Sequence, residues 1–385
     1  MTPAARIAAA IEIVDGILAG TPAEAALVNW ARGHRFAGSK DRAALRDIVF
    51  SVMRQRASCA FIGGAQTGRA LLRGYLAQEG TAEETIFGQG PYGPLALTSE
   101  DPPRRERAEM DEPTRHDLQP WVWEAFSTAY PDASAIAEAL RHRAPLWVRV
   151  NTARTTRGAV FTALEDAGHA PEPSETCSTA IRIAARERQL SQHPLFASGA
   201  FEIQDLAPQT AVLELPDPKG WKILDFCAGG GGKSLALAAR GAQVTAHDAN
   251  PRRMADLPKR ATRAGIRINV TASPAVESYD MVVCDVPCSG SGAWRRSVDT
   301  KWSLRPEGLS AYVERQRKIV VEASEALRVG GVLSYMTCSL FPQENAEQAS
   351  WIAANLPNFE LEKSKQWTPL DGGDGFYSSV FRRIR

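Results

Sequence analysis

The sequence contains no apolar run that approaches the roughly 18 residues of a transmembrane helix. Its start, MTPAARIAAAIEIVDG, carries Glu12 and Asp15 within an apolar pattern. We therefore expect an amphipathic helix there, and neither a signal peptide nor a membrane segment. The net charge is only +1, from 45 Lys and Arg against 44 Asp and Glu. The chain as a whole is not a polycation, so any surface for nucleic acid must be a local patch.

The six cysteines form no short-spaced framework, which favours free thiols in a reducing, cytoplasmic compartment over disulfides. Cys284 and Cys288 have the spacing of half a zinc site, but no second Cys or His pair has suitable spacing and the six histidines are scattered. We therefore expect no metal. A chain of 385 residues can hold two or three domains, and we expect a monomer.

Residues 1–87 are predicted to form an all-helical domain. Ile7, Ile11 and Val14 recur at helical spacing, Ser39 can cap a later helix, and no strand pattern competes. The pattern does not distinguish a helical bundle with only structural duties from one that contacts RNA, because function must be argued from sites and not from fold.

The composition changes after this helical region. Residues 88–117 hold five prolines and many charges, which is typical of a linker. Residues 118–209 then form a small α/β region, with strands predicted at LWVRVNT and AIRIA and a helix predicted over 156–167.

From residue 210 to 385 strand patterns alternate with helix patterns. This alternation predicts a doubly wound, mainly parallel sheet with helices on both faces. The predicted strands are WKILDF, AQVTAHD, IRINVTA, YDMVVCDV, GVLSYMT, FELEK and FYSSVFRRI, and the predicted helices include KSLALAAR, 251–264 with an interruption at Pro258, and 310–329.

A glycine loop, DFCAGGGGKS, follows the first of these strands. A phosphate-binding loop would need glycine where Cys227 stands. Asp225 opens the loop with an anion, which suits a cation such as the sulfonium and ammonium groups of S-adenosylmethionine, and glycines allow close backbone approach. Asp248 ends the second strand at the spacing of a ribose-binding acid. The alternative is a glycine-rich turn that only caps a helix.

Two cysteines stand where strands should end, Cys288 in DVPCSG and Cys338 in YMTCS. Ligands bind at the carboxyl ends of strands in doubly wound sheets, and adjacent strands lie only about 5 Å apart, so both thiols can face one pocket. A thiolate that adds to carbon 6 of cytosine makes carbon 5 able to take a methyl cation, and a base must then remove the carbon 5 proton. The alternative, a buried cysteine that acts as a small apolar residue, is expected for Cys284, Cys59 and Cys177.

The residues that follow DVPCSG are basic and aromatic. Arg295 and Arg296 suit contacts with RNA phosphates, and Trp294 and Trp302 suit base stacking. The alternative for such a charge run is a solvated face.

With these motifs the chain resembles the RsmB/NOP/Sun family of RNA cytosine-5 methyltransferases. DFCAGGGGKS resembles the family's D-x-C-A-A-P-G-G-K-T loop, DVPCSG its D-x-P-C-S-G motif and YMTCS its T-C-S motif. WVRVNTART resembles its R-V-N element, FASGAFEIQDLAPQ the segment that leads into its catalytic domain, and GDGFYSSVFRR its carboxyl-terminal motif. The likeness runs from Leu118 to the end. The helical start is similar, more loosely, to the NusB-like domain of bacterial ribosomal RNA methyltransferases.

The resemblance implies a Rossmann-like S-adenosylmethionine methyltransferase domain over 210–385, preceded by an RRM-like RNA-binding region. It implies that Cys338 is the nucleophile, that Cys288 assists product release, that Asp285 contacts the cytosine ring, and that Lys233 lies between loop and base. The implied cofactor-binding residues are Asp225, Cys227, Ala228, Gly229, Gly230, Gly231, Gly232, Lys233, Asp248, Ser273 and Asp285.

Two departures from the family pattern bear on the cofactor. Gly229 and Gly230 replace Ala-Pro, which predicts a looser loop because glycine loses more backbone entropy when it is fixed. Ser273 stands at or near the place of the family's adenine-binding aspartate, which predicts weaker cofactor binding.

Three functions are compatible with these features. The first is an RNA cytosine-5 methyltransferase acting on ribosomal RNA, with transfer RNA as a possible substrate. The second is a non-catalytic RNA-binding or ribosome-assembly factor that retains the fold. The third is a DNA cytosine methyltransferase with Cys288 as nucleophile, against which YMTCS and the helical front half argue.

Overall fold

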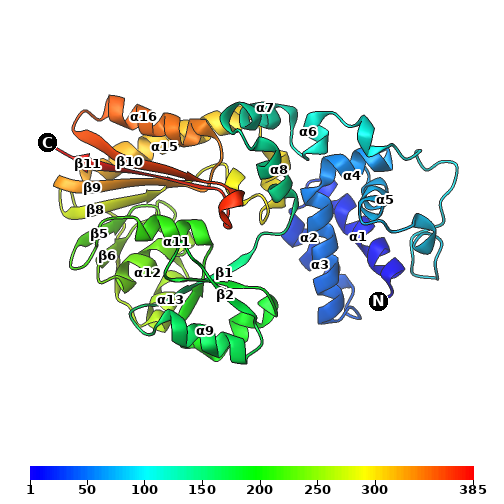
Figure 1. Cartoon of the computed structure of the whole chain (residues 1–385), viewed down its shortest axis with the longest axis horizontal. Helices are drawn as coiled ribbons and strands as arrows, with labels where there is room; N and C mark the ends of the chain where they lie inside the picture. Colours follow the sequence, from blue (N-terminus) through cyan, green and yellow to red (C-terminus); the bar gives the residue numbers. More distant parts are fainter. The chain divides into compact units, whose positions relative to one another are not determined.

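The computed structural model describes all 385 residues, which pack into two compact units (Figure 1). Unit 1 comprises Met1–Arg143 and Trp294–Leu304, and unit 2 comprises Ala144–Ala293 and Arg305–Arg385. The domain boundaries proposed above at residues 88, 118 and 210 stay predictions. None of the helices is both long and apolar enough to cross a membrane.

Unit 1 is helical, as the apolar spacing predicted. Ile7, Val14 and Ile17 line the buried face of the first helix, whose N-cap Thr2 accepts a hydrogen bond from a backbone amide. Ser39 was predicted as an N-cap but is the first residue of its helix, and Gly38 precedes it. The helices are α1 (Pro3–Leu18), α2 (Ala23–Gly33), α3 (Ser39–Arg54), α4 (Arg56–Gly63), α5 (Gly68–Gln78), η1 (Glu83–Thr85), η2 (Arg107–Glu109), α6 (Glu112–Arg115), α7 (Pro120–Ala129), α8 (Ala133–Arg141) and α14 (Val298–Ser303).

The segment Trp294–Leu304, far away in sequence, is an integral part of unit 1. Trp294 is fully buried and stacks on Phe126, with 6.2 Å between ring centroids. Lys301, 1% exposed, donates to the backbone oxygen of Arg54 at 2.9 Å. The basic and aromatic stretch after DVPCSG is thus largely a packing element of the helical unit.

Unit 2 begins with a small antiparallel sheet in the order β2-β3-β1-β4. In the central strand, Val148 and Val150 pack with Ile181 and Phe201 of its neighbours and with the helix beside the sheet. The strands predicted at LWVRVNT and AIRIA and the helix over 156–167 are all present. The elements are β1 (Leu146–Val150), α9 (Arg157–Asp166), β2 (Pro171–Pro173), β3 (Ala180–Ile183), η3 (Glu187–Gln192), α10 (Pro194–Ala197) and β4 (Phe201–Ile203).

The rest of unit 2 is a seven-stranded sheet in the order β10-β11-β9-β8-β5-β6-β7. Five neighbouring strands, β9 to β7 in that order, are parallel, and β11 pairs antiparallel with both β9 and β10. This confirms the doubly wound, mainly parallel prediction. The elements are α11 (Leu206–Leu213), β5 (Lys222–Asp225), α12 (Gly232–Ala239), β6 (Gln243–Ala246), η4 (Pro251–Met254), α13 (Leu257–Ala264), β7 (Ile268–Val270), β8 (Tyr279–Asp285), η5 (Ser291–Ala293), α15 (Pro306–Glu325), β9 (Leu327–Thr337), η6 (Pro342–Glu344), α16 (Ala346–Asn355), β10 (Phe359–Trp367), η7 (Pro369–Asp371) and β11 (Phe376–Arg383).

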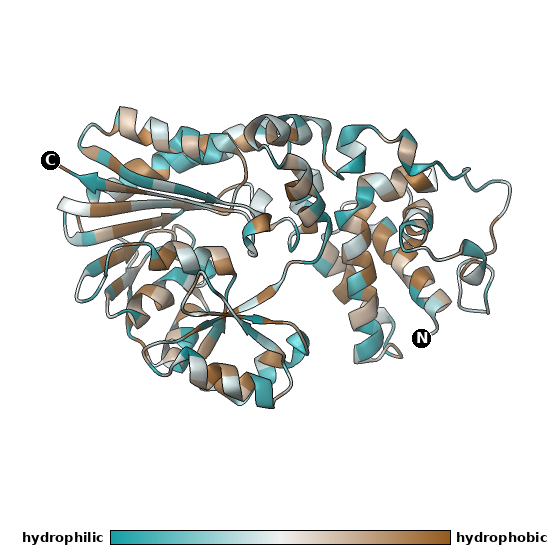
Figure 2. Ribbon diagram, viewed as in Figure 1, coloured by the Kyte–Doolittle hydropathy of each residue, from teal (hydrophilic) through white to brown (hydrophobic).

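Alternate residues of the central strands feed two separate apolar layers, as the two-residue period of a strand requires. Val282 and Cys284 pack under α15 and α16, whereas Met281 and Val283 pack under α11 and α12 on the other face (Figure 1). Figure 2 shows apolar residues concentrated along these strands. Burial on both faces explains why YDMVVCDV reads as a continuous apolar run.

Two helix predictions were wrong in their bounds. The long helix begins at Pro306 and ends at Glu325 rather than spanning 310–329, because Leu327 already pairs with Tyr279 in the sheet. The helix predicted over 251–264 is divided into η4 and α13, and Pro258 lies in the first turn of α13, where its missing N–H is tolerated.

Candidate active site

The glycine loop connects β5 to α12 through two left-handed residues. Gly229 has φ +49° and Gly231 has φ +79°, a backbone region that side chains disfavour. A β-carbon at Gly231 would overlap the side chain of Leu257. The loop therefore needs glycine at Gly231, and it presents its backbone to the pocket beside it.

Two arginines occupy the room beside the glycines that replace the family's Ala-Pro. Arg260 donates to the backbone oxygen of Gly230, and a β-carbon there would lie 3.1 Å from its guanidinium nitrogen. The guanidinium of Arg253 lies 3.5 Å from the position that a β-carbon on Gly229 would take. The guanidinium groups of Arg253 and Arg260 thus lie where side chains on residues 229 and 230 would begin.

Asp225, at the end of β5, is 1% exposed. Ser234 donates to Oδ2 at 2.6 Å, while Oδ1 has no hydrogen-bond partner. Burial raises the pKa of Asp225 to about 6. An unpartnered carboxylate oxygen beside an open loop suits a cationic ligand, as a sulfonium cofactor would be.

Asp248 lies beside the same loop, two residues after β6. It accepts hydrogen bonds from the amides of Gly229 at 3.0 Å and Asn250 at 2.9 Å, and it pairs with Arg253 at 3.2 Å. Ser273, in contrast, is exposed after β7, bonds locally to Thr271, and does not line the pocket. The structure therefore brings Asp248, but not Ser273, to the loop.

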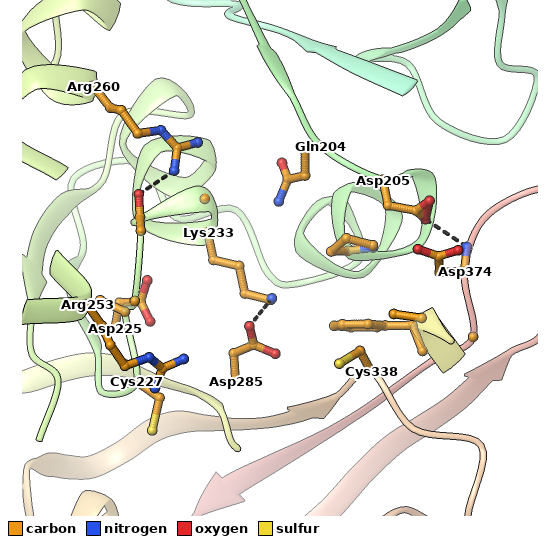
Figure 3. Close-up of a pocket in the computed structure, with 18 residues that line it drawn as sticks. Gln204, Asp205, Asp225, Cys227, Lys233, Arg253, Arg260, Asp285, Cys338 and Asp374 are labelled. Carbon is orange, nitrogen blue, oxygen red and sulfur yellow. Dashed lines mark hydrogen bonds and ion pairs between the residues drawn. The ribbon is translucent and has the colours of Figure 1, made fainter. Parts of the chain in front are cut away.

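A pocket of about 310 Å³ opens at the carboxyl edge of the sheet (Figure 3). Of the residues predicted for the site, it is lined by Asp225, Cys227, Ala228, Gly229, Gly230, Gly232, Lys233, Asp285 and Cys338. Gly231, Asp248, Ser273, Cys288, Arg295 and Arg296 are not part of its lining.

Lys233 and Asp285 meet across this pocket. Lys233 projects from the first turn of α12 and Asp285 ends β8, and their charged atoms lie 2.5 Å apart. Figure 3 shows the two side chains directed toward one another. The ammonium of Lys233 also lies 5.0 Å from the ring centroid of Phe376. A charge pair in a pocket wall can orient a polar ring.

The two thiols meet because their strands are neighbours. β8 and β9 run parallel, with Asp285 opposite Met336, and each cysteine follows a few residues later. The sulfurs of Cys288 and Cys338 lie 3.4 Å apart. Either sulfur can be the donor in this contact. The hydrogen bond with Cys338 and burial raise the pKa of Cys288, which disfavours its thiolate form.

The other cysteines are less suited to nucleophilic chemistry. Cys284, Cys59 and Cys177 are buried, as expected of small apolar residues, and all six cysteines are free. Cys227 lines the pocket, but burial raises its pKa well above the usual range for a thiol. No group of three or more His, Cys, Asp or Glu side chains is placed to hold a metal ion.

Arg295 has little accessible surface. It is 5% exposed, and its backbone oxygen accepts a hydrogen bond from Arg54 at 2.9 Å. Its contact with an RNA phosphate stays a prediction. Arg296 is exposed and stays a candidate for such a contact.

Sequence reasoning missed several residues of the site. Asp205, Asp374 and Phe376 line the pocket from segments outside the glycine and cysteine motifs. Glu344 lies beneath the cysteine loops with no exposed surface. The sequence signal for Glu344 was its place just after the apolar residues Leu340, Phe341 and Pro342. A carboxylate that is buried with such a stretch needs hydrogen-bond partners.

Comparison with known proteins agrees with this architecture. A family model described as 16S rRNA methyltransferase RsmB/F matches residues 211–379, and one described as the ferredoxin-like domain of RsmF/B-like methyltransferases matches residues 119–188. The likeness of the helical unit to a NusB-like domain stays a prediction.

Curated relatives are similar over much of the chain. Ribosomal RNA small subunit methyltransferase B of Pasteurella multocida is 30% identical over 296 residues, covering 70% of this chain and 66% of that protein. The protein of the same name from Pectobacterium carotovorum is 29% identical over 390 residues, covering 89% of this chain and 91% of that protein. The crystal structure of PH0851 has a TM-score of 0.77 at 21% identity and covers 99% of both chains, which shows the fold. The chain belongs to the RsmB/F methyltransferase family.

Proposed function

We propose that this chain is an S-adenosylmethionine-dependent RNA cytosine-5 methyltransferase that acts on ribosomal RNA through covalent addition of a thiolate. The observation that carries the proposal is the pair of sulfurs 3.4 Å apart, one of which lines the same pocket as the glycine loop and the Lys233–Asp285 pair. A methyltransferase with a reactive heteroatom as acceptor would not need two thiols there.

S-adenosylmethionine fits the residues of the loop. Asp225 offers an unpartnered carboxylate oxygen, the glycines offer backbone, and Asp248 offers a carboxylate for ribose hydroxyls. When bound, the cofactor supplies the methyl cation. Asp248 is paired with Arg253 at 3.2 Å, so ribose binding requires it to share or exchange that partner.

Cys338 is the proposed nucleophile. Its thiolate forms a bond from sulfur to carbon 6 of cytosine, and the electron pair of the ring makes carbon 5 nucleophilic. Asp285, held by Lys233, orients the ring edge near nitrogen 3. After methylation a base takes the carbon 5 proton, the ring double bond re-forms, and the sulfur of Cys338 leaves with its electron pair. Cys288 assists this release.

Ribosomal RNA is the proposed partner because the curated relatives carry that name, and the enzyme would then act in the cytoplasm as a monomer. Exposed Arg296 is a proposed phosphate contact. The small antiparallel sheet and the helical unit are further candidates for holding RNA, but no single residue there carries the assignment.

Methyl transfer by the purified chain tests the proposal. Ribosomal RNA, ribosomal particles and transfer RNA are each incubated with methyl-labelled S-adenosylmethionine, and the labelled nucleoside is identified by mass spectrometry. We expect 5-methylcytidine in ribosomal RNA, and none with Cys338→Ser. Labelling of transfer RNA alone would reassign the substrate, and a different methylated nucleoside would refute the chemistry.

A second candidate is a non-catalytic RNA-binding assembly factor. It is favoured by Ser273 in place of an adenine-binding acid and by the pairing of Asp248 with Arg253. Calorimetry with S-adenosylmethionine separates the two, because a factor of this kind should bind RNA normally and no cofactor.

A further inference from the structure

One buried carboxylate lies beneath both cysteine loops. Glu344 ends the short helix η6 and has no exposed surface. Four donors converge on its two oxygens: the amide and hydroxyl of Ser289 at 2.8 and 2.5 Å, the hydroxyl of Ser339 at 2.5 Å, and the side-chain amide of Gln316 at 2.9 Å. So many donors favour the ionised form.

Three of these four donors belong to the two residues that directly follow the thiols in sequence. Ser289 follows Cys288, and Ser339 follows Cys338. Ser289 Oγ and Ser339 Oγ both contact Glu344 Oε2 and lie 3.2 Å from one another. A single carboxylate therefore ties together the ends of two strands whose cysteines must act on one base.

The surrounding groups reinforce this tie without adding a cation. Gln316, from α15, donates both to Glu344 and to the backbone oxygen of Pro287 at 3.1 Å. Tyr335, from β9, donates its hydroxyl to the backbone oxygen of Glu344 at 2.6 Å. All the groups that donate hydrogen bonds to the carboxylate are neutral, so their dipoles stabilise its negative charge.

We propose that Glu344 is a positioning residue that holds both cysteine loops in place and, through its buried negative charge, keeps the proton of the thiol pair on Cys288, so that Cys338 is the sulfur that attacks. This inference deepens the proposed function and rests on it for the identity of the reaction. The two loops differ in their contacts with the carboxylate: Ser289, next to Cys288, donates two hydrogen bonds to it, and Ser339, next to Cys338, donates one. This difference is the geometric basis for assigning the larger effect of the charge to Cys288.

The ionisable groups around Cys288 agree with this assignment. They are the thiol of Cys338, the phenol of Tyr335 on β9, and Glu344 itself, while α15 presents the neutral Gln316. The pKa of Cys288 is raised by its hydrogen bond with Cys338, by burial, and by the negative charges of Cys338 and Glu344. Burial also raises the pKa of Glu344, and its four donors limit that rise.

Site-resolved alkylation tests the proposal on the full chain without RNA or cofactor. Iodoacetamide labelling is followed from pH 6 to pH 10, and each cysteine peptide is quantified by mass spectrometry. In the wild type, we expect Cys338 to react at lower pH than Cys288. Glu344→Gln should raise the labelling rate of Cys288 at every pH below its pKa, because loss of the nearby negative charge favours the thiolate.

Matched controls separate charge from folding. Glu347→Gln, the same change at an exposed position three residues along, should leave the profile unchanged. Glu344→Asp keeps the charge and should keep Cys288 the slower thiol, even if the chain is less stable. Cys59 and Cys284 have no exposed surface, so they must stay unlabelled in any variant that is still folded.

Two results would overturn the inference: a Cys288 profile in folded Glu344→Gln that superimposes on the wild type, or a wild type in which Cys288 reacts before Cys338. Failure of the proposed function would give a different result. The wild type would then transfer no methyl group, but its two thiols would still be labelled in the expected order.

Discussion

Replacing Asp225 by asparagine should stabilise the protein and weaken its cofactor site at the same time. In the folded chain burial raises the pKa of Asp225 from 3.8 to about 6. The folded state therefore binds more protons than the unfolded state between these pH values, and the free energy of unfolding falls as the pH rises through this window. At about 1.4 kcal/mol per pKa unit, the ionised carboxylate costs about 3 kcal/mol of stability above pH 6.

Asp225→Asn keeps the shape of the side chain and an acceptor for Ser234, but carries no charge. Denaturant unfolding should show a gain that approaches 3 kcal/mol at pH 8 and is close to zero near pH 4, where aspartate is protonated in the folded state. The control Asp166→Asn, at an exposed position, should change stability by no more than about 0.5 kcal/mol at either pH.

Cofactor binding should move in the opposite direction. Wild-type affinity for S-adenosylmethionine should rise with pH up to about 6 and then level, because only the ionised carboxylate attracts the cation, whereas Asp225→Asn should bind weakly at every pH. A gain in stability that does not depend on pH, or a variant that binds the cofactor normally, would refute this account of the loop.

Other substitutions address the remaining parts of the site. Cys338→Ser should form no covalent RNA adduct, whereas Cys288→Ser should methylate and then stall with RNA attached, which denaturing gels would show as a shifted band; the reverse pattern would indicate chemistry of the DNA-enzyme kind. Asp248→Ala should weaken S-adenosylmethionine binding by about 1–3 kcal/mol, the usual cost of unpairing a charged hydrogen bond, and unchanged calorimetry would refute its placement. Arg296→Ala should lower the salt slope of RNA binding by about one unit, and an unchanged slope would make it a solvated arginine. Trp294→Ala should destabilise the helical unit by about 3–5 kcal/mol, and a variant that melts like the wild type would contradict its role in packing.

The sheet and the meeting of the thiols were accessible from sequence because both depend on local patterns. Strand runs such as YDMVVCDV stand out by composition, and the rule that ligands bind at the carboxyl ends of parallel strands then places Cys288 and Cys338 at one edge. The glycine loop was identified in the same way, since Asp225 and Gly231 stand at its two ends.

The other features of the site could not be predicted, because they depend on packing between segments that are distant in sequence. Arg295 carries the same charge as Arg296, and only the return of its segment into the helical unit shows that it is buried. Glu344 is distant in sequence from Ser289 and gains its meaning only when the two cysteine loops lie together. Asp374 and Phe376 lie just before and at the start of β11 and reach the pocket because β11 pairs with β9. No local sequence pattern specifies that pairing.

Bisulfite sequencing of ribosomal RNA tests the central claim most directly. RNA would be compared from cells that lack this protein and from the same cells supplied with the wild type or with Cys338→Ser. The account predicts at least one cytosine that resists conversion only when the wild type is present. Identical conversion maps in all three, with the wild-type protein folded and expressed, would contradict it.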